Sequence, residues 1–177
     1  FRNEFKNVGW FFRHYREIGV TEFHIVDNGS TDGTKEFLEK EPDVKLYDRS
    51  DASFRAAKFG VNWLNEIRSK VGKNKWCLFV DADEMFVYPG YPDLPLTKLT
   101  IKLERLGQRC LIAPMIDMFN AQSTFLKTHE ESSLPEKIYP NYMPAYIRFF
   151  SSDQYPYMGV RGGAREYFFG KSLLEVS

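Results

Sequence analysis

The residues best suited to chemistry form a carboxylate cluster near the middle of the chain. Asp81, Asp83 and Glu84 directly follow the apolar run Trp76–Val80, which predicts a strand buried on both faces. Carboxylates at the edge of an apolar core repel one another and lose hydration unless a cation or a base neutralises them. Hard divalent cations such as Mg²⁺ or Mn²⁺ prefer oxygen pairs of the Asp-x-Asp kind. We therefore interpret Asp81 and Asp83 as metal ligands, the alternative being helix-capping acids at a solvated strand end.

A second motif follows the predicted strand 23–26. Asp27 ends this strand, and residues 28–34 (Asn-Gly-Ser-Thr-Asp-Gly-Thr) are rich in glycine and in hydroxyl side chains. The glycines permit a tight turn, and Asp32 with the hydroxyls can cap a following helix. A well-capped turn between strand and helix would explain everything except the acid at the end of the strand. A carboxylate there can accept hydrogen bonds from a ribose or a base edge, as in nucleotide-binding folds.

The pattern of apolar residues predicts the elements that position these acids. Strands and helices alternate in the first half, which indicates a mostly parallel sheet with helices on both faces. In such sheets ligands bind beyond the carboxyl ends of the strands, where Asp27 and Asp81 are expected. Helices are predicted over residues 5–18, from the 28–34 loop to about Leu38, 54–71 and 96–106, and strands over 23–26, 44–47, 76–80, 110–118 and 146–150.

Composition excludes several classes of protein. The chain has 177 residues, 43% of them hydrophobic, and contains 16 Phe, 10 Tyr and 3 Trp, which is too aromatic for a disordered tail. Its 24 basic and 24 acidic residues balance, so bulk electrostatics gives no reason to expect a nucleic-acid partner. No apolar run approaches the roughly 20 residues of a membrane span. Cys77 and Cys110 have no metal-ligand spacing, and we expect both to be buried free thiols.

Three segments together resemble a known family. Residues 27–34, Asp-Asn-Gly-Ser-Thr-Asp-Gly-Thr, resemble the second-strand motif of family 2 glycosyltransferases of the GT-A fold. Val-Asp-Ala-Asp-Glu at residues 80–84 falls where that family keeps its Asp-x-Asp, and Arg2-Asn3-Glu4 is similar to the Arg-Asn-Glu after its first strand. The resemblance covers roughly residues 1 to 90. The aromatic residue, Val and Pro89 after the acids, with Gly-Gly-Ala-Arg at 162–165, look most like the branch called glycosyl transferase family 2, type 4.

The resemblance implies a fold and an activity. The fold would be α/β, GT-A-like, with a Rossmann-like sheet in a single domain over residues 1–177, truncated at both ends. Residues 1–90 would bind the nucleotide sugar and residues 91–177 would face the acceptor. The reaction would be a Mn²⁺- or Mg²⁺-dependent transfer from a UDP- or GDP-sugar to a hydroxyl of a carbohydrate or glycan acceptor, with inversion. The protein would be cytoplasmic, or peripheral at the inner membrane.

The resemblance also implies roles for individual residues. Arg2, Asn3 and Glu4 would line the base pocket, and Asp27 would accept a hydrogen bond from uracil or ribose. Asp83 would hold the metal that bridges the donor diphosphate, while Asp81 lies nearer the ribose or shares the metal. Family members usually carry a small-Arg-Asn segment before the Asp-x-Asp strand, where this chain has Ala-Ala-Lys-Phe at residues 56–59. Lys58 on that predicted helix would contact a phosphate or remain solvated.

An inverting transfer also needs a carboxylate that removes the proton of the acceptor hydroxyl. The candidates are Asp117, within the apolar stretch 111–118, and Glu166, beside a glycine pair. A base beyond Ser177 is the third possibility. Two alternative functions stay open: a haloacid-dehalogenase-like phosphatase with Asp81 as its nucleophile, and a non-catalytic module that binds a sugar nucleotide. The phosphatase motif normally opens its domain, whereas here some 80 residues precede it.

Overall fold

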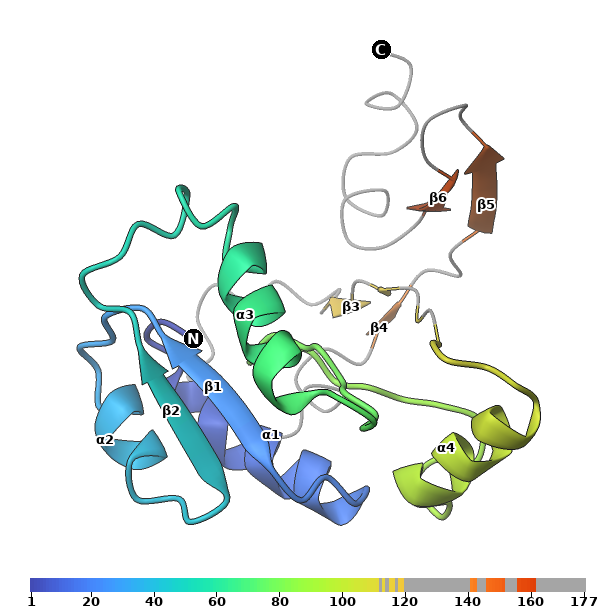
Figure 1. The fold of residues 1–177 in the computed structure, drawn as a ribbon, viewed down its shortest axis with the longest axis horizontal. Coiled ribbons are helices and arrows are strands. Elements are labelled where there is room, and N and C mark those ends of the chain that lie inside the picture. Colours follow the sequence, from blue (N-terminus) through green and yellow to red (C-terminus); the bar gives the residue numbers. More distant parts are fainter. Residues whose placement is uncertain are drawn as a thin grey trace. The chain divides into compact units, whose positions relative to one another are not determined.

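The computed structural model forms two compact units, residues 1–108 and 109–177 (Figure 1). The residues that it describes are 1–111, 113, 115, 116, 118, 119, 141, 142, 146–151 and 156–161. The acid-rich motifs of the sequence all lie in the first unit.

The first unit begins with a helix and a parallel pair of strands. Helix α1 (Phe5–Glu17) is followed by β1 (Phe23–Asp27), α2 (Thr34–Leu38) and β2 (Val44–Asp48). β1 and β2 are parallel, with Phe23 beside Val44 and Asp27 beside Asp48. These elements confirm the predicted strand–helix–strand order and the prediction that Asp27 ends its strand.

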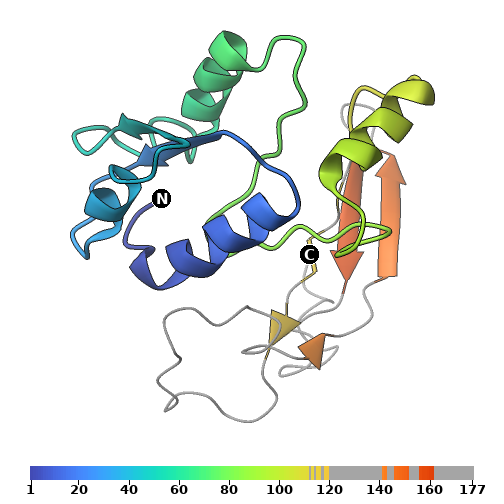
Figure 2. The same ribbon diagram turned by 90° about the horizontal axis from the view of Figure 1, so that it is seen from below.

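Alternate residues of β1 face the core, as the period of a strand requires. Phe23 and Ile25 are buried, and the ring of Phe23 lies 4.9 Å from that of Phe12 on α1. Phe12 in turn stacks on Phe37 of α2 at 5.9 Å. Helices α1 and α2 therefore cover one face of the small sheet, whereas α3 (Val61–Val71) lies on the opposite face (Figure 2).

The predicted helix over residues 54–71 is wrong in its first part, because α3 begins only at Val61. Lys58, Phe59 and Gly60 have φ values of +51°, +56° and +84°. Successive left-handed residues cannot continue a right-handed helix. Lys58 thus lies in the irregular segment before α3 rather than on the helix.

The predicted buried strand over residues 76–80 is also wrong. This segment forms no strand in the structure, and Leu78 and Phe79 are 40% and 50% exposed. Since a strand exists only when another strand pairs with it, an apolar run by itself does not suffice. Cys77 within this segment and Cys110 are both exposed, which corrects the prediction of buried thiols.

Helix α4 (Leu96–Arg105) confirms the predicted fourth helix. In the second unit, β3 (Met118–Phe119) pairs antiparallel with β4 (Asn141–Tyr142), and β5 (Tyr146–Ser151) with β6 (Pro156–Arg161). The strand predicted at 146–150 is therefore confirmed. The strand predicted at 110–118 is wrong for residues 110, 111, 113, 115 and 116, which belong to no strand.

Within the described residues the chain is thus a mixed α/β protein with a small, two-stranded parallel sheet. The helices in this part of the chain are too short and too polar to cross a membrane.

Candidate functional site

The loop after β1 is organised by the carboxylate of Asp27, which is fully buried. Its Oδ2 accepts hydrogen bonds from the backbone N–H groups of Gly29 and Ser30, both at 3.1 Å. Its Oδ1 accepts a third bond from the Ser30 hydroxyl at 2.5 Å. Because hydrogen bonds to a charged group are stronger than neutral ones, Asp27 fixes the path of the loop that leaves the strand.

The segment before α1 is joined to this loop. The backbone N–H of Asn3 donates to the Ser30 hydroxyl at 3.0 Å, and the Asn3 side chain accepts from the backbone N–H of Thr31 at 2.8 Å. One residue further, the backbone N–H of Glu4 donates to the Thr34 hydroxyl at 2.9 Å. Residues 3–4 and 30–34, far apart in the sequence, therefore form one hydrogen-bonded layer.

Asp32 completes this layer. Its carboxylate accepts bonds from the backbone N–H groups of Phe5 and Thr34, at 3.1 and 3.0 Å, and from the Thr34 hydroxyl at 2.6 Å. Partial desolvation acts to raise the pKa of Asp32, but the bonds from Thr34 and Phe5 outweigh it and lower the pKa below its usual value. The N-cap of α2 is Gly33, which makes no side-chain capping bond, so the prediction that Asp32 caps this helix is met only in that Asp32 accepts from the N–H of Thr34, the first helical residue.

The acids at residues 81–84 form a tight turn. The backbone N–H of Glu84 donates to the carbonyl of Asp81 at 3.2 Å, and the Glu84 side chain accepts from the N–H of Asp81 at 2.8 Å. Asp81 and Asp83 are exposed. Neither carboxylate accepts a hydrogen bond or forms an ion pair with another described residue. The turn therefore presents two charged carboxylates that are available to a ligand.

Two buried side chains of α1 hold the backbone beyond this turn, and sequence reasoning missed both. The hydroxyl of Tyr15 donates to the carbonyl of Glu84 at 3.0 Å and accepts from the N–H of Phe86 at 3.1 Å. Nε2 of His14 lies 3.2 Å from the carbonyl of Phe86. Burial raises the pKa of Tyr15 to about 12. The helical spacing marked Tyr15 only as a core residue, and nothing in the sequence pointed to its hydroxyl.

Phe1 brings these segments together at the carboxyl end of β1. Its N–H donates to the carbonyl of Val26 at 2.5 Å, and its carbonyl accepts from the N–H of Asn28 at 3.0 Å. Phe1 and Val26 line the same cavity as Asp81 and Glu84, which places the acidic turn near the carboxyl end of β1.

Asn28 links this region to the loop after β2. Its side-chain Nδ2 donates to the carbonyl of Arg49 at 2.7 Å and to that of Ala52 at 3.0 Å. Both segments that follow the strands are thus held together at the same edge of the sheet.

Two of the predicted site residues are cations. Arg2 and Lys58 are exposed, and neither forms an ion pair with another described residue. A guanidinium or an ammonium group in this state can bind a phosphate without first breaking a contact within the protein.

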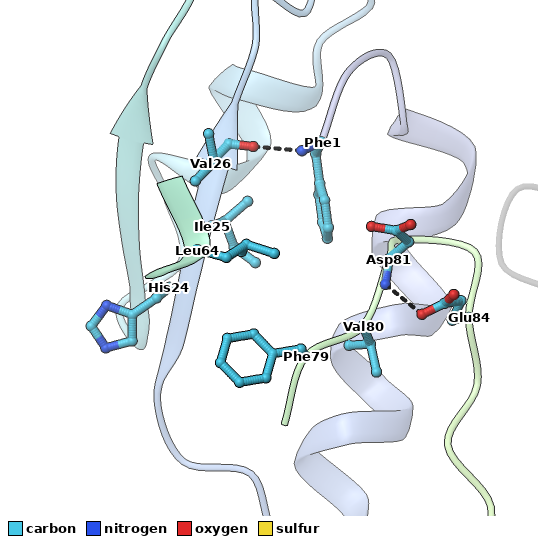
Figure 3. A pocket seen from close by; sticks show the side chains of 9 residues that line it. All are labelled: Phe1, His24, Ile25, Val26, Leu64, Phe79, Val80, Asp81 and Glu84. Atoms are coloured by element: carbon cyan, nitrogen blue, oxygen red, sulfur yellow. Dashed lines mark hydrogen bonds between the residues drawn. The ribbon is translucent and has the colours of Figure 1, made fainter. Parts of the chain in front are cut away.

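A cavity of about 240 Å³ opens beside Phe1 (Figure 3). It lies below the 300–1,000 Å³ range of pockets that enclose small molecules. Most of its wall is apolar, and Asp81 and Glu84 stand at one end of it. The lining residues are Phe1, His24, Ile25, Val26, Leu64, Phe79, Val80, Asp81 and Glu84.

Asp81 and Asp83 could supply only part of the ligand shell of a metal ion. Among the described residues, no group of three or more His, Cys, Asp or Glu side chains could hold an ion. Mg²⁺ usually binds through one or two carboxylates and completes its shell with water and substrate phosphates. Asp81 and Asp83 supply that number of carboxylates.

The two candidate bases, Asp117 and Glu166, lie outside the described residues. Comparison of the chain with protein-family models, with curated proteins and with solved structures gives no match.

Proposed function

We propose that this chain is a GT-A-like, metal-dependent glycosyltransferase that moves a sugar from a UDP- or GDP-sugar to an acceptor hydroxyl with inversion. One observation carries the proposal. Residues 3 and 4 bond to the 30–34 loop, and Asp81 and Glu84 line one cavity with Phe1 and Val26, so the segments that hold the three motifs approach one another around the carboxyl end of β1. This is the edge of a parallel sheet at which α/β proteins bind their ligands.

The charged residues of the proposed site have two different roles, metal binding and phosphate binding. Asp81 and Asp83 hold a divalent cation together with the donor diphosphate, since both carboxylates lack partners among the described residues. Such an ion supplies Lewis-acid help, because it offsets the negative charge that grows on the departing nucleotide. Arg2 and Lys58 are available to bind the phosphates.

For Asp27 we propose a positioning role instead of the direct contact with uracil or ribose that the family resemblance implies. Its two carboxylate oxygens already accept three bonds from Gly29 and Ser30, and the side chain is buried. We therefore propose that Asp27 positions the 28–31 loop, whose exposed groups then contact the base or the ribose. A direct bond from Asp27 to the donor would require this loop to open.

Removal of the acceptor's proton is assigned to Asp117, to Glu166 or to a carboxylate beyond Ser177. Each of these remains a prediction from the sequence. The general base must reach the acceptor hydroxyl directly or through one water.

Calorimetric titration of UDP and GDP with and without Mn²⁺ tests the donor site. We expect one nucleotide to bind only with Mn²⁺, and Asp83→Ala to lose this binding. Asp93→Ala is the matched control, because Asp93 is also an exposed aspartate of the first unit but lies outside the motif. Absence of binding by either nucleotide, with a native circular-dichroism spectrum, would contradict the proposal.

Two further outcomes separate the alternative functions. A labile aspartyl-phosphate on Asp81 after incubation with a phosphomonoester would establish the phosphatase. Binding of a sugar nucleotide without turnover in the presence of a panel of glycan acceptors would favour the non-catalytic module.

A further inference from the structure

Glu84 holds the backbone of the acidic turn 81–84. Its Oε2 accepts a hydrogen bond from the backbone N–H of Asp81 at 2.8 Å (Figure 3), and its own N–H donates to the carbonyl of Asp81 at 3.2 Å. Both polar groups of the Asp81 backbone are therefore bonded to Glu84. The first bond joins a carboxylate to the N–H three residues earlier, as the glutamate or glutamine of a capping box does.

The backbone of Glu84 is fixed in turn by Tyr15 of α1. The Tyr15 hydroxyl donates to the carbonyl of Glu84 at 3.0 Å and accepts from the N–H of Phe86 at 3.1 Å. Tyr15 is buried, and its ring lies 4.6 Å from that of Phe11 in the core. The N–H, the carbonyl and one carboxylate oxygen of Glu84 thus all have partners, which tie the acidic turn to the core.

The acidic turn exposes its two aspartates and buries the residue between them. Ala82 is 3% exposed, whereas Asp81 and Asp83 are both exposed. Because the backbone of Asp81 is held at its N–H and at its carbonyl, the direction in which its side chain leaves the turn is held as well. A side chain that is ordered before binding loses less conformational entropy when a ligand binds. The turn therefore presents Asp81 and Asp83 in a preset arrangement.

We propose that Glu84 is a positioning residue for the metal ligands Asp81 and Asp83 and is not itself a third ligand. This inference rests on the proposed function, from which it takes the divalent ion. One carboxylate oxygen of Glu84 is already bonded to the backbone of Asp81. In the part of the chain that the structure describes, no three acids are arranged to hold an ion, so the three acids of the turn do not converge. Residues that orient metal ligands typically change metal affinity about 10- to 100-fold when they are replaced.

The test compares Glu84→Ala with Glu84→Gln in the full chain. Both substitutions remove the same charge, but only glutamine keeps an oxygen that can accept from the N–H of Asp81. Binding of Mn²⁺ is measured by the relaxation of water protons, first with Mn²⁺ alone and then with UDP or GDP added, and the variants are compared where the parent binds most tightly. We expect Glu84→Ala to bind Mn²⁺ at least about tenfold more weakly than Glu84→Gln. The control Asp93→Ala should bind as the parent does.

Equal Mn²⁺ affinities of the two variants, each with a native circular-dichroism spectrum, would overturn the inference. If both bound much more weakly than the parent, Glu84 would be a ligand of the ion; if both bound as the parent does, Glu84 would have no part in the site. Either result leaves the proposed function standing, because the parent still binds Mn²⁺. Absence of Mn²⁺ binding by the parent in every condition would instead refute the metal site of the proposed function, and this inference with it. The two failures are therefore distinguishable.

Discussion

The substitution Asp27→Ala is expected to make the first unit unfold more easily, because it removes the acceptor of the hydrogen bonds that hold the 28–31 loop. The carboxylate is fully buried and accepts bonds from two backbone N–H groups and one hydroxyl. Truncation leaves the N–H groups of Gly29 and Ser30 without their partner. The effect is therefore expected even when no ligand is present.

The expected size follows from the number of groups left unpaired. A buried donor that loses its partner costs about 1–3 kcal/mol. Gly29 and Ser30 are only half-buried, so water can replace part of what the two N–H groups lose. We expect Asp27→Ala to lower the free energy of unfolding by about 2–3 kcal/mol. Asp27→Asn keeps one carbonyl oxygen for the two N–H groups, and we expect it to cost about 1 kcal/mol.

Urea unfolding measures these differences. Trp10, Trp63 and Trp76 all lie in the first unit, so tryptophan fluorescence reports on that unit. Asp93→Ala is the control, and an exposed substitution of this kind should stay within about 0.5 kcal/mol of the parent.

The opposite pattern would refute the reasoning. If Asp27→Ala kept the parent's stability within about 0.5 kcal/mol but lost nucleotide binding, Asp27 would be a ligand contact and not the organiser of its loop. Loss of stability in Asp27→Ala, with binding largely retained in Asp27→Asn, is the result that the geometry leads us to expect.

Two more predictions concern the segment after the acidic turn and the cysteines. Because burial raises the pKa of Tyr15 to about 12, its stabilising contribution should be complete below pH 10 and should decline between pH 10 and about 12. Tyr15→Phe removes the bonds to Glu84 and Phe86, and it should lower the free energy of unfolding by about 1–2 kcal/mol at pH 8 and by less at pH 11. Urea unfolding at both pH values measures this difference. The same loss at both pH values would contradict the prediction. Cys77 and Cys110 are exposed, so both should react with a thiol reagent in the native protein. The single variants Cys77→Ser and Cys110→Ser show which of the two thiols reacts. A thiol that reacts only after denaturation would contradict its exposure in the structure.

The elements that the sequence predicts well are those that depend on local patterns. Helix α1 ends at Glu17, two residues after its last buried aromatic residue, Tyr15, and Gly19 beyond it has a φ of +103°, as a glycine stop should. Strands β1 and β2 have the predicted places because each is short, rich in β-branched or aromatic residues, and has the other as its partner. These decisions involve only neighbours in sequence and one adjacent strand.

The segment 76–80 could not be predicted in this way. Its apolar composition favours a strand, but strand formation depends on whether a partner edge is present. The prediction of where α3 starts was wrong for a different reason, because the left-handed conformations of Lys58 and Phe59 are rare for residues other than glycine. Only Gly60 carried a local signal for that break.

In the candidate site, too, the sequence predicts what depends on residue type and not what depends on tertiary contacts. The sequence located the acids that gather at the carboxyl end of β1, but residue types do not say which carboxylate is buried. Asp27, Asp32 and Asp83 look alike in the sequence, yet the first two accept bonds within the fold, whereas the third has no partner among the residues that the structure describes. The contact of Asp27 with a base or ribose stays a prediction.

The side chain of Asn28 has a consequence for covalent modification. Asn28-Gly29-Ser30 matches the acceptor signal for N-linked glycosylation. The nitrogen that would carry the glycan is half-buried and already donates to the carbonyls of Arg49 and Ala52. A glycan could be attached only before these bonds form, and it would then keep the two loops apart. Asn28 is therefore not available for glycosylation in the folded protein. In a secretory expression host, a glycan attached to Asn28 before folding would hinder folding of this region.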